Sequence, residues 1–184
     1  TFKVRAINSE GSGLEAYAEA MPRAYVARIG ETGYATINEA LAAIGTGETA
    51  TITLLKNIDH NSGISLNNKK VIFELNGYTL NIVSSDEYVS ALDVYNGGGV
   101  ALSGEGALNV TGPASAYAVT VSSYSALSQV TVTNATSSGP DSKAVHAYGN
   151  VSLVVLGDVI ATGPRSFGVH AQEGSVIEVR GNVS

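Results

Sequence analysis

Short apolar segments recur from residue 64 to the end of the chain, and glycine, proline, asparagine or serine separates each one from the next. Three of these segments follow a Gly-Pro pair: TGPASAYAVTV (111–121), SGPDSKAVHA (138–147) and TGPRSFGVHA (162–171). The Gly-Pro pairs begin at residues 112, 139 and 163, a period of 27 and then 24 residues. When SALDV (90–94) is added to the series, the apolar positions that align are Leu92, Val119, Val145 and Val169.

Two further series of short strands occur in the same periods. The second series is VIFEL (71–75), VAL (100–102), ALSQV (126–130), VSLVV (151–155) and SVIEV (175–179), and the third is TLNI (79–82), ALNV (107–110), TVT (131–133) and VIA (159–161). Because no helix pattern separates these strands, their hydrogen bonds are satisfied only if each coil stacks on the one before. We therefore predict an all-β fold for residues 64–184, a single-stranded right-handed parallel β-helix that forms a three-faced solenoid.

Residues 23–63 follow a different pattern, which predicts an N-terminal cap with the first strands. A strand is expected at Tyr25–Ile29, and TINEALAAI (36–44) has apolar residues at helical spacing. Thr36 precedes Glu39 by three residues, a capping-box pattern that begins a helix, and Gly45 ends it. TATITLLKNI (49–58) then resumes a strand pattern.

This order of strand, helix TINEALAAI, strand TITLLKNI and irregular glycine-rich repeats resembles the right-handed parallel β-helix modules related to pectate lyases. Such modules occur in many exported bacterial proteins, and in them a helix covers the first turn of the coil. The resemblance spans residues 25–184. It implies the fold and an exported protein, and its loose motifs imply little about chemistry.

Residues 1–22 are typical of a hairpin. Phe2 and Val4 alternate with Lys3 and Arg5, a turn follows at 8–13, and a second strand is expected at Tyr17–Met21. The phrase VRAIN followed by a Gly-Ser turn resembles the last hairpin of a fibronectin type III domain. The resemblance implies that residues 1–22 are the remnant of such a domain.

The composition of the chain limits the classes of partner that we expect it to bind. Charged residues make up only 14% of the chain, the formal net charge is -6, and cysteine is absent. We expect no nucleic-acid partner, because an acidic surface without a basic patch repels phosphate. No apolar run is long enough to predict insertion into a membrane, no cofactor is expected, and the lack of cysteine fits a secreted or cell-surface protein.

Alternation along the aligned strands predicts one outward face that carries the candidate chemistry. Its candidate ligand-binding residues are Asp93, Tyr95, Thr120, His146, Tyr148, His170 and Gln172. Tyrosine rings among hydroxyl and imidazole groups favour a polysaccharide or cell-wall glycan as partner. A metal ion shared by His146 and His170 is a second interpretation, although it needs a third ligand, and no metal site is assigned.

Catalysis on this chain is not favoured. Glycoside hydrolysis needs two carboxyl groups about 5 to 9.5 Å apart, whereas Glu74 and Glu178 are expected four coils, or about 19 Å, apart. Asp86, Glu87 and Asp93 are the one candidate acidic cluster.

We predict a non-catalytic spacer or adhesin-like carbohydrate-binding module. The alternative is the N-terminal part of a polysaccharide lyase or glycoside hydrolase whose catalytic turns lie downstream. An uncapped last coil at 176–183 further predicts self-association.

Overall fold

The computed structural model describes residues 2–4, 7–8, 11–12, 16–18 and 24–184. In the N-terminal segment β1 (Phe2–Val4) pairs antiparallel with β4 (Ala16–Ala18), and β2 (Ile7–Asn8) pairs antiparallel with β3 (Gly11–Ser12). The predicted hairpin is therefore present. Residues 19–21 of its expected second strand lie outside the described part, and the relation to a fibronectin domain stays a prediction.

The cap consists of a hairpin and one short helix. β5 (Ala27–Ile29) pairs antiparallel with β6 (Thr32–Tyr34), and α1 (Ile37–Ala42) follows. The Thr36 hydroxyl accepts the backbone N–H of Glu39 at 3.1 Å, and the Glu39 carboxylate accepts the N–H of Ala35 at 3.0 Å. Reciprocal capping thus begins the helix at the predicted residue, while the helix ends two residues before the predicted Ile44.

From residue 49 onward the chain forms a β-solenoid of about five turns with three faces. Face 1 holds β9 (Ile64–Asn67), β12 (Leu92–Tyr95), the first halves of β15 (Tyr117–Val132) and β17 (Lys143–Val155), and β19 (Phe167–Gln172). Face 2 holds β7 (Thr49–Leu54), β10 (Lys70–Glu74), β13 (Gly99–Ser103), the second halves of β15 and β17, and β20 (Val176–Val179). Face 3 holds β8 (Ile58–His60), β11 (Thr79–Val83), β14 (Ala107–Thr111), β16 (Asn134–Ser137) and β18 (Val159–Ala161).

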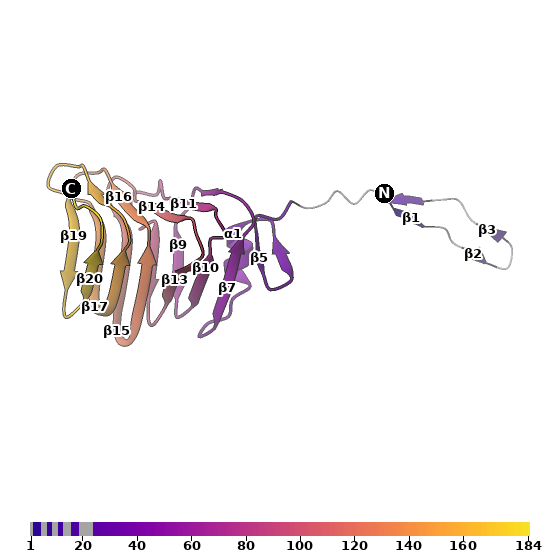
Figure 1. Ribbon diagram of the computed structural model, residues 1–184, viewed down its shortest axis with the longest axis horizontal. Coiled ribbons are helices and arrows are strands. Elements are labelled where there is room, and N and C mark those ends of the chain that lie inside the picture. The colour runs from indigo at the N-terminus through magenta and orange to yellow at the C-terminus, as the bar shows by residue number, and fades with distance from the viewer. Residues whose placement is uncertain (1, 5–6, 9–10, 13–15, 19–23) are drawn as a thin grey trace.

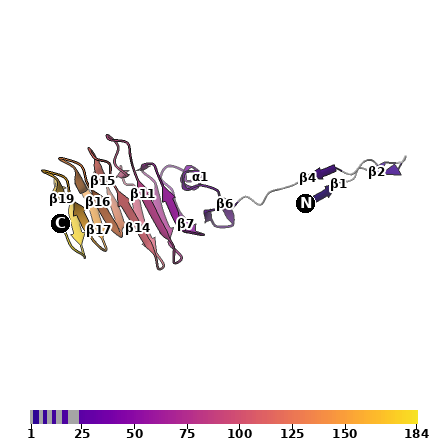
Figure 2. The ribbon, with the colours of Figure 1, turned by 90° about the horizontal axis from the view of Figure 1, so that it is seen from above.

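The strands of each face pair in parallel with those of the next coil, so successive coils lie side by side along one axis (Figures 1 and 2). On face 1 the register aligns Leu92, Val119, Val145 and Val169, as predicted. The parallel all-β fold read from the repeats is therefore confirmed. β7 and β8, the first strands of the expected cap, already pair in parallel with the following coil.

One predicted strand is wrong. TVT (131–133) does not belong to face 3, because Thr131 and Val132 continue β15 on face 2, where they pair with Val154 and Val155. The face 3 strand of that coil is β16, which aligns Asn134 with Asn109 of β14. The chain turns the corner between faces at Thr133, whose hydroxyl accepts the backbone N–H of Leu108 at 2.9 Å. Apolar alternation runs through such a corner and does not reveal it.

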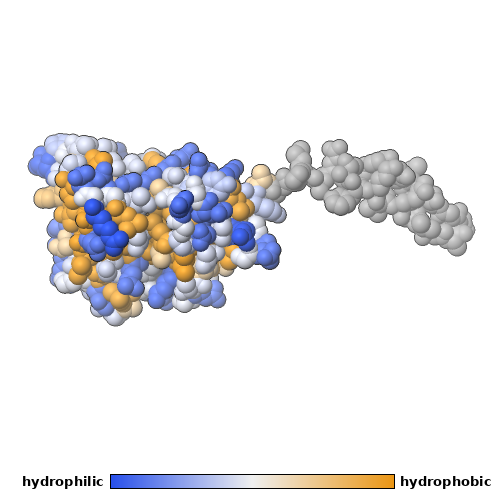
Figure 3. All heavy atoms as spheres, in the orientation of Figure 1, coloured by the Kyte–Doolittle hydropathy of each residue, from blue (hydrophilic) through white to orange (hydrophobic). Residues whose placement is uncertain are grey.

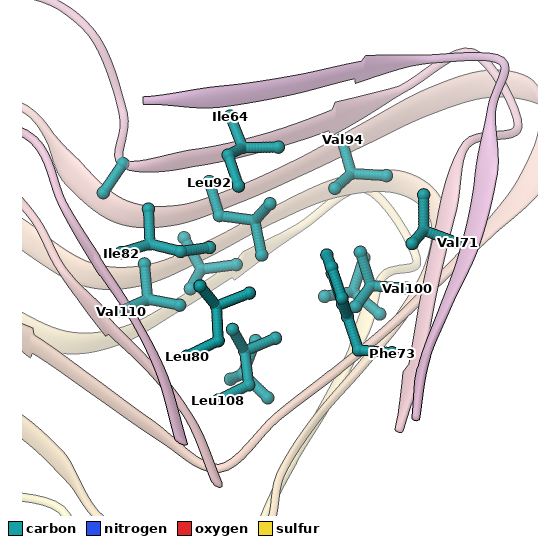
Figure 4. Packing of buried hydrophobic residues seen from close by; sticks show 14 of the residues in the cluster. Ile64, Val71, Phe73, Leu80, Ile82, Leu92, Val94, Val100, Leu108 and Val110 are labelled. Carbon is teal, nitrogen blue, oxygen red and sulfur yellow. The ribbon is translucent and has the colours of Figure 1, made fainter. Parts of the chain in front are cut away.

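Alternate residues of all three faces point into one apolar interior (Figure 4). The side chains that meet there include Ile64 and Leu92 from face 1, Phe73 and Val100 from face 2, and Leu80 and Leu108 from face 3. At the N-terminal end Ile37, Ala40 and Ile44 join the same core, so α1 covers the first coil. Burial in the last coil is weaker, and Val176 and Val183 are 60% and 54% exposed.

The repeated Gly-Pro pairs are stacked turns. A Cβ atom on Gly139 would overlap the backbone of Ala114 in the preceding coil, and one on Gly163 would overlap the backbone of Gly139. Only glycine lets the turns approach this closely, since every other residue carries a Cβ atom. An ion pair of 2.6 Å between Arg165 and Asp141 joins the last two of these turns.

A ladder of polar side chains runs along the outside of face 3, with one member in each coil. Its members are Asp59, Asn81, Asn109, Asn134, Asp158 and Asn182. Each amide N–H donates toward the N-terminal end; Asn109 donates to Asn81 at 3.0 Å and accepts from Asn134 at 2.9 Å. The ladder thus links successive coils, and every step has a side-chain donor except the one from Asp158, whose backbone N–H donates to Asn134 at 2.8 Å.

Candidate functional site

All seven predicted site residues lie on the outward side of face 1. The register places Asp93, Thr120, His146 and His170 in one row across β12, β15, β17 and β19, and Tyr95, Ser122, Tyr148 and Gln172 in the next. Their inward neighbours in the first three of these strands are fully buried, whereas the outward side chains are at least partly exposed. The predicted face is therefore present, but its members do not all meet.

Four rings in three successive coils contact one another in series, and we call them the ring cluster: Tyr117, His146, His170 and Phe167. The ring centroids of Tyr117 and His146 lie 5.0 Å apart, those of the two histidines 5.1 Å apart at an interplanar angle of 16°, and those of His170 and Phe167 6.2 Å apart. These distances are typical of interacting rings. Phe167 is 56% exposed, so the cluster presents apolar surface to solvent.

Lys143 lies beside the ring cluster. Its ammonium nitrogen is 4.8 Å from the centroid of the Tyr117 ring and donates to the Tyr117 hydroxyl at 3.4 Å. A cation at this distance from a ring face is attracted by the ring electrons. The cluster therefore includes a fixed positive charge on an otherwise acidic chain.

Both imidazoles of the cluster are held in a defined state. Nε2 of His146 donates to the Oε1 atom of Gln172 at 3.1 Å, and the Nδ1 atoms of His146 and His170 are buried without a hydrogen-bond partner among the described residues. Burial lowers the pKa of His170, and the charges of Lys143 and His146 lower this pKa further. Burial and the neighbouring cations thus favour the neutral form of the His170 ring.

A second aromatic pair lies on the same face. Tyr124 and Tyr148 make an edge-to-face contact with centroids 5.3 Å apart, and Tyr124 is 81% exposed. Tyr124 projects because the register of β15 shifts between Ser123 and Ser128. The Tyr148 hydroxyl donates to the Glu173 carboxylate and shares a hydrogen bond with Tyr124, and these contacts raise the pKa of Tyr148 to about 12, so its phenol stays protonated.

Three predicted residues lie apart from the rings. Thr120 shares a hydrogen bond of 2.9 Å with Ser90. Asp93 lies two coils from His146 in the register, and burial raises the pKa of its carboxyl group. Tyr95 is likewise two coils from Tyr148. The structure thus joins His146, His170 and Gln172 and leaves Asp93, Tyr95 and Thr120 outside the cluster.

The sequence prediction missed Tyr117, Lys143 and Phe167, which share one column of the register. They lie at the corner before face 1, where alternation fails because Ala118 and Val119 are both buried. A signal was present: when the three Gly-Pro repeats are aligned, these residues fall at the same distance before the aligned valines. Tyr124 carried no comparable signal, since its exposure depends on the irregular register of β15.

Glu74 and Glu178, the two carboxylates considered for hydrolysis, lie on strands of face 2 that are four coils apart, as expected. Glu74 accepts a hydrogen bond from Ser103 at 2.9 Å, and Glu178 pairs with Arg180 at 2.7 Å. Among the described residues no group of three or more His, Cys, Asp or Glu is placed to hold a metal ion. Nor does any helix within 24–184 have the length and apolar character needed to cross a membrane.

Comparison of the chain with protein-family models, with curated proteins and with solved structures gives no match. We therefore infer the function from the side chains on the surface of the solenoid. Apolar residues also lie elsewhere on the solenoid (Figure 3), including a shallow hollow on face 2 lined by Ile72, Ala101 and Leu127. That hollow lacks ring side chains, which distinguishes it from face 1.

Proposed function

We propose that this chain is a non-catalytic module of a secreted or cell-surface protein and that it binds a glycan on face 1. The observation that carries the proposal is the ring cluster, in which Tyr117, His146, His170 and Phe167 contact one another in series. Exposed ring faces offer apolar area to the C–H side of a sugar, while hydroxyl and imidazole groups at the edge bind its hydroxyls.

The solenoid suits an extended ligand. Adjacent coils lie about 4.8 Å apart, so side chains in one row recur at a short, regular spacing along the axis. Rings from three successive coils form the cluster, and Tyr124 and Tyr148 extend the aromatic surface. A rod of stacked coils also serves as a spacer, and the two roles are compatible.

The carboxylates considered for hydrolysis do not favour the enzyme alternative. Asp93 is the one carboxylate in the predicted rows of face 1, and Glu74 and Glu178 are engaged by Ser103 and Arg180. We accordingly propose binding without catalysis for this chain.

A glycan array probed with wild type and with Phe167→Ala and Tyr124→Ala variants tests the proposal. Both side chains are exposed, so their removal leaves the core intact. We expect each variant to bind the best glycan about tenfold more weakly, the loss of about 1.4 kcal/mol that is typical of one aromatic contact at an interface.

Tyr25→Ala is the matched control, because Tyr25 is 47% exposed and contacts Gly33 in the cap, away from the ring cluster. It should bind like wild type. Equal binding by all variants would refute the ring surface as the site. Absence of any bound glycan would leave the spacer role alone.

A further inference from the structure

One side of the ring cluster presents hydrogen-bond donors. The Lys143 ammonium group carries only donors. Nε2 of His146 carries a proton, because it donates to the Gln172 oxygen at 3.1 Å. His170 has its Nδ1 atom buried without a partner, and burying an N–H with no acceptor is costly. Its proton is therefore also on Nε2.

The charged side chain nearest to these donors, Lys143, is positive. Lys143 from β17 is near enough to lower the pKa of His170, and it makes no ion pair with a carboxylate of the described residues. Tyr117 faces Lys143 from β15, and its hydroxyl accepts from the ammonium group at 3.4 Å. Asp93 lies two coils away from His146, and Glu173 is engaged by Tyr148.

We propose that Lys143 and His170, with His146 packed between Tyr117 and His170, form a subsite for an acidic group of the bound glycan, a carboxylate or a sulfate ester. This inference rests on the proposed glycan-binding function and names the chemical class of the ligand. An oxyanion accepts hydrogen bonds from the ammonium group and from Nε2 of His170, whereas Nε2 of His146 is engaged by Gln172. Hydrogen bonds to charged partners are about twice as strong as neutral ones.

The same geometry argues against a metal ion shared by the two histidines. The ammonium group of Lys143 repels a cation, and no third ligand of the His, Cys, Asp or Glu type joins them in the described part of the chain. An anion instead neutralises the excess positive charge. It also stabilises the imidazolium form of His170, so its affinity should rise as the pH falls below 6.5, the ordinary pKa of histidine.

Inorganic sulfate provides a test that needs no glycan. The imidazole NMR signals are followed during titration with sodium sulfate, against sodium chloride at equal ionic strength. The chain has three histidines, and His60 on β8 of face 3 is the internal control. We expect saturable shifts at His146 and His170, a raised pKa for His170, and little change at His60.

The variant Lys143→Gln should weaken sulfate binding about fivefold, the effect of losing one exposed charge partner worth up to about 1 kcal/mol. Circular dichroism verifies that the variant keeps its fold. Sulfate shifts that are equal at all three histidines, or shifts unchanged by Lys143→Gln, would overturn the subsite.

The glycan array separates the two sources of the anion. It should carry neutral, carboxylated and sulfated forms of one backbone, together with similar sets on other backbones. For chondroitin sulfate these are the polymer that is both carboxyl-reduced and desulfated, the desulfated polymer and the carboxyl-reduced polymer. We expect acidic members to bind at least fivefold more tightly than their neutral counterparts. Equal binding of neutral and acidic members would overturn the acidic subsite and leave glycan binding intact. Saturable sulfate binding with no bound glycan would overturn the proposed function alone.

Discussion

Asn109 occupies the middle of the polar ladder on face 3, and its replacement by alanine should weaken the solenoid measurably. The change removes the bonds of 3.0 Å to Asn81 and 2.9 Å from Asn134. Each contributes about 0.5 to 1.5 kcal/mol. Since Asn109 is half-buried and water can replace part of the loss, we expect the free energy of unfolding to fall by about 1 to 2 kcal/mol.

A second substitution at this position tests the direction of the ladder. Asp59 begins the ladder as an acceptor, so Asn81 must turn its N–H toward Asp59 and its oxygen toward Asn109. In Asn109→Asp the introduced carboxylate would face that oxygen and could not donate to it. The pKa of this carboxyl group should therefore be raised in the folded state. The donated bond exists only when the group is protonated, so its stabilisation is present at low pH and is lost as the pH rises through that pKa.

Urea unfolding followed by circular dichroism at pH 7 and pH 4 measures both effects. Asn150→Ala is the control, because Asn150 is an exposed asparagine on β17 outside the ladder, and its replacement should change the stability by less than about 0.5 kcal/mol. If Asn109→Ala costs no more than Asn150→Ala, the ladder contributes nothing to stability. If Asn109→Asp is equally destabilised at both pH values, the assigned donor direction is wrong.

Four other substitutions test separate parts of the structure. In Gly139→Ala the added Cβ would overlap the backbone of Ala114; the free energy of unfolding in urea should fall by about 2 to 3 kcal/mol. Thr36→Ala removes the hydroxyl that caps α1 and should cost about 1 kcal/mol in the same assay. The pKa of His170 is lowered in the folded protein, so the folded state favours the neutral ring and loses stability relative to the unfolded state as the pH falls below 6.5. The melting temperature of His170→Gln should therefore fall less at acid pH than that of wild type. Arg165→Ala breaks an exposed ion pair and should change the melting temperature little, since such pairs contribute about 0 to 1 kcal/mol.

The parallel solenoid and the register of face 1 could be predicted because Gly-Pro turns recur in three successive coils, at residues 112, 139 and 163. These turns mark the same structural position each time, so the aligned residues Val119, Val145 and Val169 are true neighbours. Successive turns approach too closely to leave room for a Cβ atom, so glycine recurs at these positions for a steric reason.

Corners between faces were harder to predict. At Thr133 the chain turns without glycine or proline, so the apolar pattern gave no sign that β15 had ended and the third strand was displaced. Ala118 and Val119 are both buried, so strict alternation did not place Tyr117 on the outward side. Alternation describes a strand well and fails where the chain bends.

Only the part of the candidate site that lies within regular strands could be predicted. His146 and His170 lie within a regular strand, and their adjacency follows from the register. Contacts made by side chains across different rows depend on rotamers. The stacking of Phe167 on His170 and the bond from His146 to Gln172 are of this kind, and they appear only in the three-dimensional structure.

Mapping of the bound glycan by NMR tests the central claim most directly. Backbone amide signals are assigned, and the best glycan from the array is titrated until its effect saturates. We predict that the largest shifts fall on residues 117–124, 143–149 and 167–173, which carry the ring surface of face 1. Shifts concentrated instead around Ile72 and Leu127, at the hollow of face 2, would contradict the account.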